Sequence, residues 1–219
     1  MEAMMIKDFK VLTKNKMFIL WNIMIIIYAV ITGVLNKELL MISRMFTMLG
    51  AYYFSMILMW GDDKKGMYLS SLPMARANII LSKYLVLILY SLGITFFQEF
   101  IGNGLRVILY NSSIRLDSIV MNISIVILVS IVLESMFITL YTKFGYNGNI
   151  NAIMIFAMAI FPALIRKMFT EEQIIGFVQK FNETFSNGYT SGAMFLSIAA
   201  IICIVSMYIS VHFYKAKEF

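Results

Sequence analysis

Long apolar runs dominate this chain, and they decide what it can fold into. A helix needs about 20 apolar residues to cross the hydrocarbon core of a bilayer. Six segments approach or reach that length, at about residues 17–35, 39–60, 79–101, 118–142, 150–165 and 193–214. With 61% hydrophobic and 14% charged residues, the chain is not a soluble globular domain. We predict an all-α membrane protein with six transmembrane helices, in which residues 1–219 form a single domain.

Residues 2–16 precede the first run and predict an amphipathic helix. Its apolar positions share one face and its cations share the opposite face, at Met5, Phe9 and Leu12 and at Lys7, Lys10 and Lys14. Such a helix lies flat in the membrane interface, with its cations toward lipid headgroups.

The distribution of Lys and Arg indicates an orientation. Six spans place both termini on the same side of the membrane. Of the 18 Lys and Arg residues, eleven fall on that side and seven fall on the other. Because short loops rich in Lys and Arg stay in the cytoplasm, we predict that both termini are cytoplasmic. The abundance of Met, Ile, Asn and Lys favours the plasma membrane of a bacterium with an AT-rich genome. The net charge of +6 fits contact with anionic lipid, and no basic stripe indicates binding to nucleic acid.

The longest polar stretch is Gly61–Tyr84, which follows the second apolar run and extends into the start of the third. Carboxylates suit a helix N-terminus, and the stretch opens with two of them. It predicts a short amphipathic helix, formed from the acidic pair, an apolar edge and the proline that ends it: Asp62, Asp63, Tyr68, Leu69, Leu72 and Pro73. Such a helix could receive force from a soluble partner, or it could be a surface loop that only joins two spans.

The same stretch carries a pattern: acidic residues, then Tyr-Leu-x-Ser-Leu-Pro-x-x-Arg, then Ile-x-x-Ser-Lys-Tyr. The matching residues are Asp62, Asp63, Tyr68, Leu69, Ser71, Leu72, Pro73, Arg76, Ile80, Ser82, Lys83 and Tyr84. The pattern resembles the loop after the second membrane helix of ABC-2-type permeases, which are the membrane subunits of ABC exporters. Gly61 stands where many relatives have Glu. Within that group the chain is similar to small permeases of Gram-positive bacteria that export peptides such as phenol-soluble modulins.

The resemblance implies a mechanism and a set of partners. Two cytoplasmic ATPase subunits, carrying ATP and Mg, would dock beneath a dimer of this permease with itself or with a second permease. Residues 2–16 would be the elbow helix, and the loop 61–78 would couple ATP binding to alternating access. The substrate would be a hydrophobic or amphipathic peptide. This chain has no G-x-x-x-x-G-K-[ST] sequence, so ATP would be bound by another chain and no cofactor is expected here.

A second amphipathic helix is predicted on the extracellular side, at about residues 170–186, followed by Gly188 and Gly192. Thr170 and Gln173 form a capping box. The apolar face follows at Ile174, Val178, Phe181 and Phe185. The resemblance implies a re-entrant gate helix near the exit of the export path, and the alternative is an interfacial helix that only anchors the loop.

Two carboxylates lie inside predicted spans and are candidates for the substrate path. Ionisable groups in hydrocarbon are costly, so Glu134 and Glu99 should face the bundle or a wet cavity. Glu99 shares a helix face with Asn103 and Arg106, so a local structural pair between Glu99 and Arg106 is the alternative for that residue. Glu134 has no partner in its own helix and either pairs with another span or lines the path. Arg44 is expected to extend its stem to the outer headgroups.

Two other classes of function stay open. An ion-coupled secondary transporter would use Glu134 and Glu99 as coupling carboxylates. A non-transporting immunity or sensor subunit would capture a peptide at the bilayer. No H-E-x-x-H sequence occurs, and with one histidine, His212, and one cysteine, Cys203, the chain predicts neither a metal site nor an enzyme. Small residues that permit close approach of helices are Gly33, Gly50, Ala51 and Gly93.

Overall fold

The computed structural model describes residues 2–35, 39–63, 76–111, 116–145, 167, 173 and 187–216. Within these ranges the elements are helices, and no strand occurs among the described residues. The helices are α1 (Glu2–Lys14), α2 (Lys16–Leu35), α3 (Leu39–Asp63), α5 (Arg76–Tyr110), α6 (Leu116–Phe144) and α9 (Gly188–Ala216).

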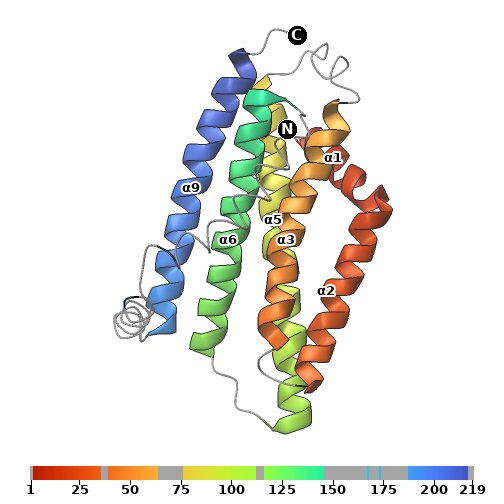
Figure 1. Ribbon diagram of the computed structural model, residues 1–219, viewed down its shortest axis with the longest axis vertical. Coiled ribbons are helices and arrows are strands. Elements are labelled where there is room, and N and C mark those ends of the chain that lie inside the picture. The colour runs from red at the N-terminus through yellow and green to blue at the C-terminus, as the bar shows by residue number, and fades with distance from the viewer. Residues whose placement is uncertain are drawn as a thin grey trace.

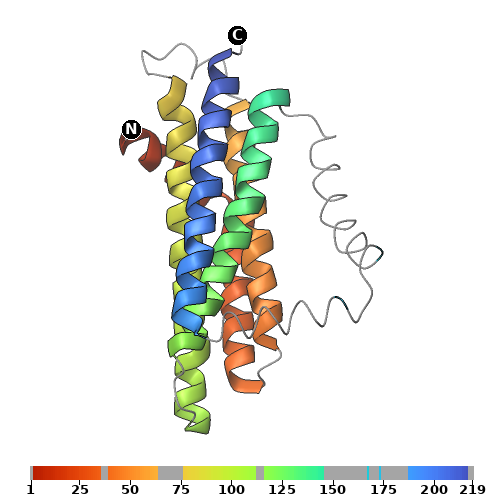
Figure 2. The ribbon, with the colours of Figure 1, turned by 90° about the vertical axis from the view of Figure 1, so that its left-hand side faces the viewer.

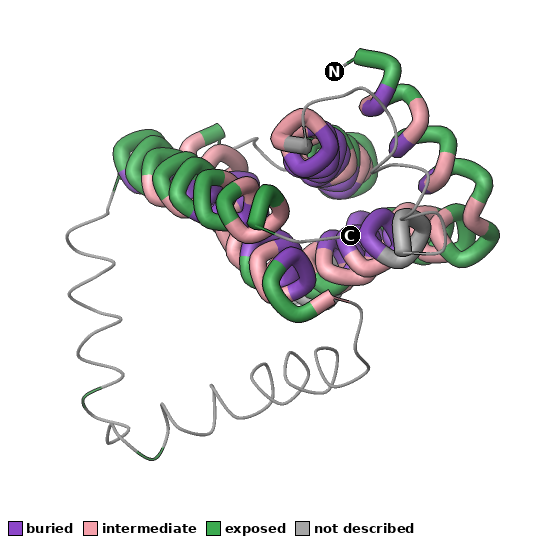
Figure 3. Tube along the Cα trace, turned by 90° about the horizontal axis from the view of Figure 1, so that it is seen from above, coloured by how far each residue is buried: buried purple, intermediate pink, exposed green. Residues whose placement is uncertain are grey.

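The long helices form a bundle in which α9, α6, α3 and α2 stand in one curved row and α5 packs against one side of it (Figures 1 and 3). Helices α2 and α5 run in one direction, and α3, α6 and α9 run in the other (Figure 1). The short helix α1 lies across the bundle and contacts α2, α3 and α5 (Figure 2). We call the end of the bundle nearest to α1 the α1 end. Helices α3, α6 and α9 finish at this end, and α5 begins there.

Four helices of the described part are long and apolar enough to cross a membrane, judged by length and composition: α2, α5, α6 and α9. Helix α3, predicted as the second span, is 25 residues long and packs between α2 and α6. Its crossing of the membrane stays a prediction. The predicted span 150–165 lies outside the described residues. The chain is therefore a helical protein with at least four candidate spans.

Helix α5 is longer than its apolar run. Its 35 residues correspond to about 52 Å of helix at 1.5 Å per residue. The predicted third span was placed at about residues 79–101, but the helix continues to Tyr110 and extends beyond its neighbours at the end opposite α1 (Figures 1 and 2). The hydroxyl of Tyr110 donates to the carbonyl of Val34, so this extension is bonded to α2.

Asparagine and glycine mark several helix ends. The side chain of Asn15 accepts the backbone N–H two residues on, at 2.9 Å, and so caps α2 and separates it from α1. Asn187 caps α9 in the same way, at 3.0 Å. Helices α5 and α6 are followed directly by Asn111 and Gly145, which have φ angles of 48° and 74°. This left-handed conformation stops a helix, and glycine and asparagine are the residues that adopt it most readily.

Small residues allow helices to approach at specific points. A Cβ on Gly33 would lie 2.9 Å from the Cβ of Leu105, and a Cβ on Gly50 would lie 2.6 Å from the indole nitrogen of Trp21. The same prediction for Gly93 is wrong, because no atom lies within 4 Å of a Cβ built there. Close packing of α2 on α3 and α5 therefore depends on two glycines of the predicted set.

The first turns of α9 also approach α6 closely. A Cβ on Gly188 would collide with the backbone carbonyl of Asp117, and a Cβ on Gly192 would lie 2.8 Å from a methyl of Val120. The prediction that these glycines close an extracellular helix is corrected here, because both belong to α9.

Helix α1 turns a different face to the bundle than its apolar pattern predicts. Its buried residues are Met4, Asp8 and Leu12, whereas the side chain of Phe9 is 48% exposed. Of the predicted apolar face, Leu12 is buried in the bundle, whereas Phe9 is not. The reason is that Asp8 has bonding partners inside the bundle, described below.

Candidate functional site

The interior of the bundle contains polar side chains along α5, the helix behind the row. Figure 3 shows buried residues on α5 and on the inner faces of the helices around it. The buried polar residues of α5 are Ser82, Lys83, Ser91, Thr95, Gln98 and Glu99. Buried polar groups are costly in hydrocarbon unless they are paired. Their partners therefore define where α5 is bonded to other helices.

Glu134 lies in the middle of α6 and faces α5. Its side chain is buried, with 3% of the residue exposed, and one carboxyl oxygen accepts a hydrogen bond of 2.7 Å from the hydroxyl of Ser91. Among the described residues, no Lys or Arg forms an ion pair with it. Glu134 is therefore hydrogen-bonded to another predicted span, and its role in the substrate path stays a prediction.

Glu99 pairs with a residue far away in the sequence. Its carboxylate lies 2.7 Å from the Nε of Arg44 on α3, and its second oxygen accepts a 2.9 Å hydrogen bond from Asn103. The side chains of Arg44 and Glu99 are only 19% and 3% exposed. Two predictions are corrected: Arg44 is paired with a carboxylate of another helix, and the partner of Glu99 is Arg44 rather than Arg106. The reason is that α3 packs on α5 and brings Arg44 to the carboxylate, whereas Arg106 lies two turns along the same helix.

Arg106 lies one turn beyond Asn103 on α5. Its Nη2 is buried and has no hydrogen-bond partner among the residues that the structure describes. Both Arg44 and Glu99 are close enough to act on it electrostatically. This end of α5 therefore brings two guanidinium groups and one carboxylate together.

A third polar cluster, at the α1 end, was not anticipated from the sequence. The hydroxyl of Ser82 donates to one carboxyl oxygen of Asp8 at 2.8 Å, and the ammonium of Lys83 lies 3.9 Å from the other. The ammonium also donates to the carbonyl of Leu58 on α3, at 3.1 Å. Three helices thus meet at one buried charge pair. The available signal was an acidic residue, Asp8, on the apolar side of an otherwise basic helix.

Hydroxyl groups join α5 to α6 and α9. The phenol of Tyr84 lies 2.6 Å from the hydroxyl of Ser206 and 3.0 Å from that of Ser210. Thr139 of α6 is bonded to the same two serines, at 2.8 and 3.0 Å. Because hydrogen bonds between helices replace the apolar driving force that is missing in lipid, this cluster fixes the parallel pair α6 and α9 on α5.

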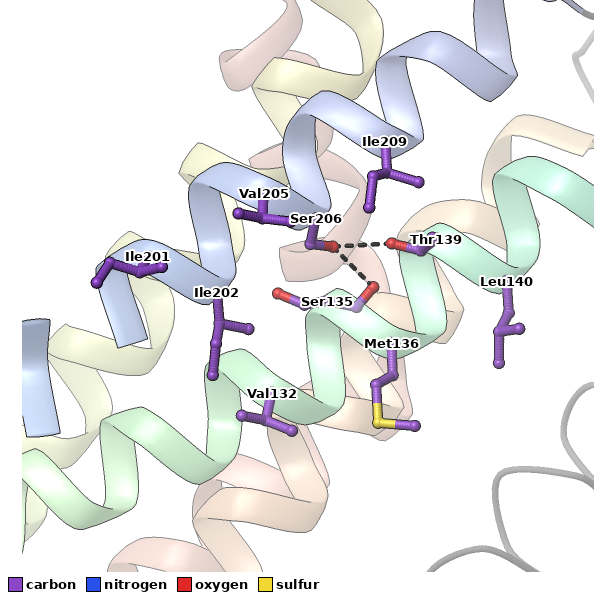
Figure 4. Close-up of a pocket in the computed structure, with 10 residues that line it drawn as sticks. All are labelled: Val132, Ser135, Met136, Thr139, Leu140, Ile201, Ile202, Val205, Ser206 and Ile209. Atoms are coloured by element: carbon purple, nitrogen blue, oxygen red, sulfur yellow. Dashed lines mark hydrogen bonds between the residues drawn. The ribbon is translucent and has the colours of Figure 1, made fainter. Parts of the chain in front are cut away.

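The outer side of the α6–α9 pair forms an apolar groove of about 440 Å³. Figure 4 shows Ser206 at its floor, bonded to Thr139 and to the backbone carbonyl of Ser135. The walls are apolar side chains of both helices, namely Val132, Met136, Leu140, Ile201, Ile202, Val205 and Ile209. A groove of this lining suits an acyl chain or the apolar face of a helix.

The predicted ATPase-coupling residues are only partly described. Asp62 and Asp63 are the last residues of α3, so they do not begin a separate helix as predicted, and Arg76 is the first residue of α5. The other predicted members lie outside the described residues: Tyr68, Leu69, Ser71, Leu72 and Pro73. The predicted gate residues Ile174, Val178 and Phe181 also lie outside them.

A bundle of long apolar helices with paired polar groups inside defines a multi-pass membrane protein. The sequence matches the family described as ABC-2 family transporter protein over residues 3–215, and the chain belongs to that family. Membership supports the role of a permease subunit of an ABC transporter, which is a transport subunit and not the catalytic one, and it implies an ABC ATPase partner. No curated protein and no solved structure matches the chain significantly.

Proposed function

We propose that this chain is the permease of an ATP-driven exporter that moves a hydrophobic or amphipathic peptide out of a bacterial cell. The family match over residues 3–215 carries the proposal, because it covers nearly the whole chain. A peptide such as a phenol-soluble modulin is the substrate class that the sequence resemblance favours. The working unit is a dimer of this permease, with itself or with a second permease, above two ATPase subunits that carry ATP and Mg.

The arrangement of α3 and α5 supports coupling at the α1 end. Asp63 ends α3 and Arg76 begins α5, so residues 64–75 connect the two helices there. Force applied by an ATPase at this connection reaches α5 at its first turn. From that point α5 passes Ser91, which bonds Glu134, and Glu99, which bonds Arg44. In this proposal, alternating access is a movement of α5 and α3 relative to the rest of the bundle.

The two carboxylates have different places in the proposal. Glu99 is neutralised by Arg44, which favours a structural role. Glu134 is buried beside Ser91 without a described cation, so a path that opens between α5 and α6 would expose a negative charge. Such a charge attracts the cationic face of an amphipathic peptide.

One observation keeps the ion-coupled secondary transporter as a second candidate. A membrane carboxylate with a hydroxyl partner and no cation can exchange a proton, and Glu134 has that environment. This candidate predicts transport in vesicles that contain the chain alone and a proton gradient, and no transport by Glu134→Gln. The exporter proposal predicts no transport in those vesicles without an ATPase.

The decisive experiment is co-purification of the tagged chain from its native membrane. The test variant changes Leu69 and Leu72 to Asp, on the predicted apolar edge of the coupling segment. The matched control places the same two carboxylates off that edge, as Ser70→Asp with Ala75→Asp. We expect an ABC ATPase with the wild type and the control, and its loss from the test variant at equal membrane abundance. If no ATPase accompanies the wild type, the proposal fails.

A further inference from the structure

The charge pair of Asp8 and Lys83 is almost fully buried, and its contribution to stability does not explain why it is there. Asp8 is 1% exposed and Lys83 is 2% exposed. Removing two charges from water costs several kcal/mol per ion, on the order of what their attraction returns, so such a pair adds little net stability. Its best attested use is to specify one arrangement over another.

The alternative arrangement can be identified in α1. Its apolar pattern would bury Phe9 next to Met5 and Leu12, and a helix of this kind is free to roll on an apolar surface. In the structure α1 is rolled so that Asp8 faces the bundle, and Ile6 and Phe9 stay about half exposed. The apolar packing that Ile6 and Phe9 do not make in this arrangement is offset by the bonds of Asp8 to Ser82 and Lys83.

The partners of the pair lie at the two helix ends, of α3 and α5, that would receive movement from an ATPase under the proposed function. Lys83 is in the second turn after the start of α5, and Leu58, whose carbonyl it bonds, is in the last turns of α3. Ser82, next to Lys83, holds the other oxygen of Asp8 at 2.8 Å. One ammonium therefore ties both helices that flank residues 64–75 to a single carboxylate of α1.

We propose that Asp8 and Lys83 are positioning residues that lock the roll of α1 to the facing ends of α3 and α5. The pair makes α1 follow these two ends as one body. It therefore sets the geometry of the bundle end that, under the proposed function, faces the ATPase. The inference rests on that function only for its effect on ATP hydrolysis, because the roll of α1 is measurable in the chain alone.

The first test measures the roll directly. Cys203 is the single cysteine, so Cys203→Ser gives a background into which Phe9→Cys or Met4→Cys is introduced. In mild detergent, N-ethylmaleimide should label a cysteine at position 9 rapidly and one at position 4 slowly, since Phe9 is 48% and Met4 is 4% exposed. The double variant Asp8→Asn with Lys83→Met removes both charges and leaves no buried charge unpaired. It should reverse the order of the labelling rates, by about tenfold if the pair supplies about 1.4 kcal/mol of preference.

The matched control removes a neutral hydrogen-bonded pair that also joins α5 to another helix. The hydroxyl of Tyr90 on α5 donates to Asn22 on α2 at 2.8 Å. The variant Asn22→Leu with Tyr90→Phe should leave the labelling order of α1 unchanged. An unchanged order in the Asp8 and Lys83 double variant would overturn the proposal, whether or not an ATPase partner is found.

The second test measures ATP hydrolysis by the purified complex in lipid vesicles. We expect the Asp8 and Lys83 double variant to retain its ATPase and its thermal midpoint but to change the hydrolysis rate at least about tenfold, while the Asn22 and Tyr90 control keeps it. A rolled α1 with an unchanged rate would overturn the coupling part of the proposal. Absence of any co-purified ATPase would overturn the proposed function instead, and the labelling result would stand by itself.

Discussion

The ion pair between Arg44 and Glu99 allows a quantitative test of what holds α3 on α5. The variant Glu99→Leu removes the carboxylate and leaves the guanidinium of Arg44 in a site where 19% of its side chain is exposed. Asn103 keeps its second acceptor, the backbone carbonyl of residue 99, at 2.9 Å. The change therefore removes the carboxylate that neutralises Arg44 and that also acts on Arg106, while the hydrogen bond from Asn103 to the backbone remains.

The magnitude follows from the burial of the two partners. Breaking a buried pair by removing one partner costs about 3–5 kcal/mol. Because Arg44 retains some exposure and a flexible stem, we expect the lower limit, about 3 kcal/mol. For a chain of this size that is a fall of roughly 6–12 °C in the unfolding midpoint. The double variant Arg44→Leu with Glu99→Leu removes both members of the ion pair, and with them the repulsion between Arg44 and Arg106, and should lie within about 1 kcal/mol of the wild type.

Thermal unfolding in mild detergent is a direct assay. Trp21 reports on the same region, because its indole N–H donates to the backbone of Phe46 at 3.1 Å, on α3 near Arg44. Changing the exposed Glu2 to Gln serves as the control for loss of a carboxylate. A Glu99→Leu midpoint within 2 °C of the wild type, or a double variant no more stable than the single one, would refute the reasoning. Glu99 would then be a candidate for the transport path again.

Two further predictions use the same assay. Glu134→Gln keeps an acceptor for Ser91 and removes an ionisable group from the interior, so the midpoint should stay equal or rise while export of a cationic amphipathic peptide falls; a drop of several degrees would indicate a structural role instead. Gly188→Ala forces a Cβ into the backbone of Asp117 and should lower the midpoint by several degrees. Gly93→Ala, with open space around it, should change stability by no more than about 1 kcal/mol, and equal effects of the two changes would contradict the packing described for α9.

The positions of the long helices were accessible from the sequence, because length and apolar character decide which segments lie in a bilayer. The first run was predicted at about 17–35 and α2 covers Lys16–Leu35. The run at 118–142 lies within α6, Leu116–Phe144. The C-terminal part of α5 was not included in the predicted span because polar residues such as Asn103 and Arg106 interrupt the apolar run. In the structure Asn103 is bonded to Glu99 within α5, and the hydroxyl of Tyr110 bonds this part of the helix to α2.

The partners of the polar residues were not accessible in the same way. Helical periodicity shows which residues share a face, so it suggested Arg106 as the partner of Glu99. It cannot show which helix stands opposite, and the actual partner, Arg44, is 55 residues away. The pairing of Asp8 with Lys83 and Ser82 has the same character, with 74 residues between Asp8 and Ser82. Prediction failed where a tertiary contact competed with a local one.

The bonds of α5 lead to a mechanical consequence. Each other described helix is bonded to it by at least one polar contact: α1 through Asp8, α2 through Asn22, α3 through Arg44, α6 through Glu134 and α9 through Ser206. Apolar burial gives helices in lipid little reason to associate, and one such bond contributes only about 0.6 kcal/mol on average. A displacement of α5 along its axis, however, strains all of these bonds together. A push on its first turn therefore acts on the contacts with all five of these helices and is not absorbed by one of them.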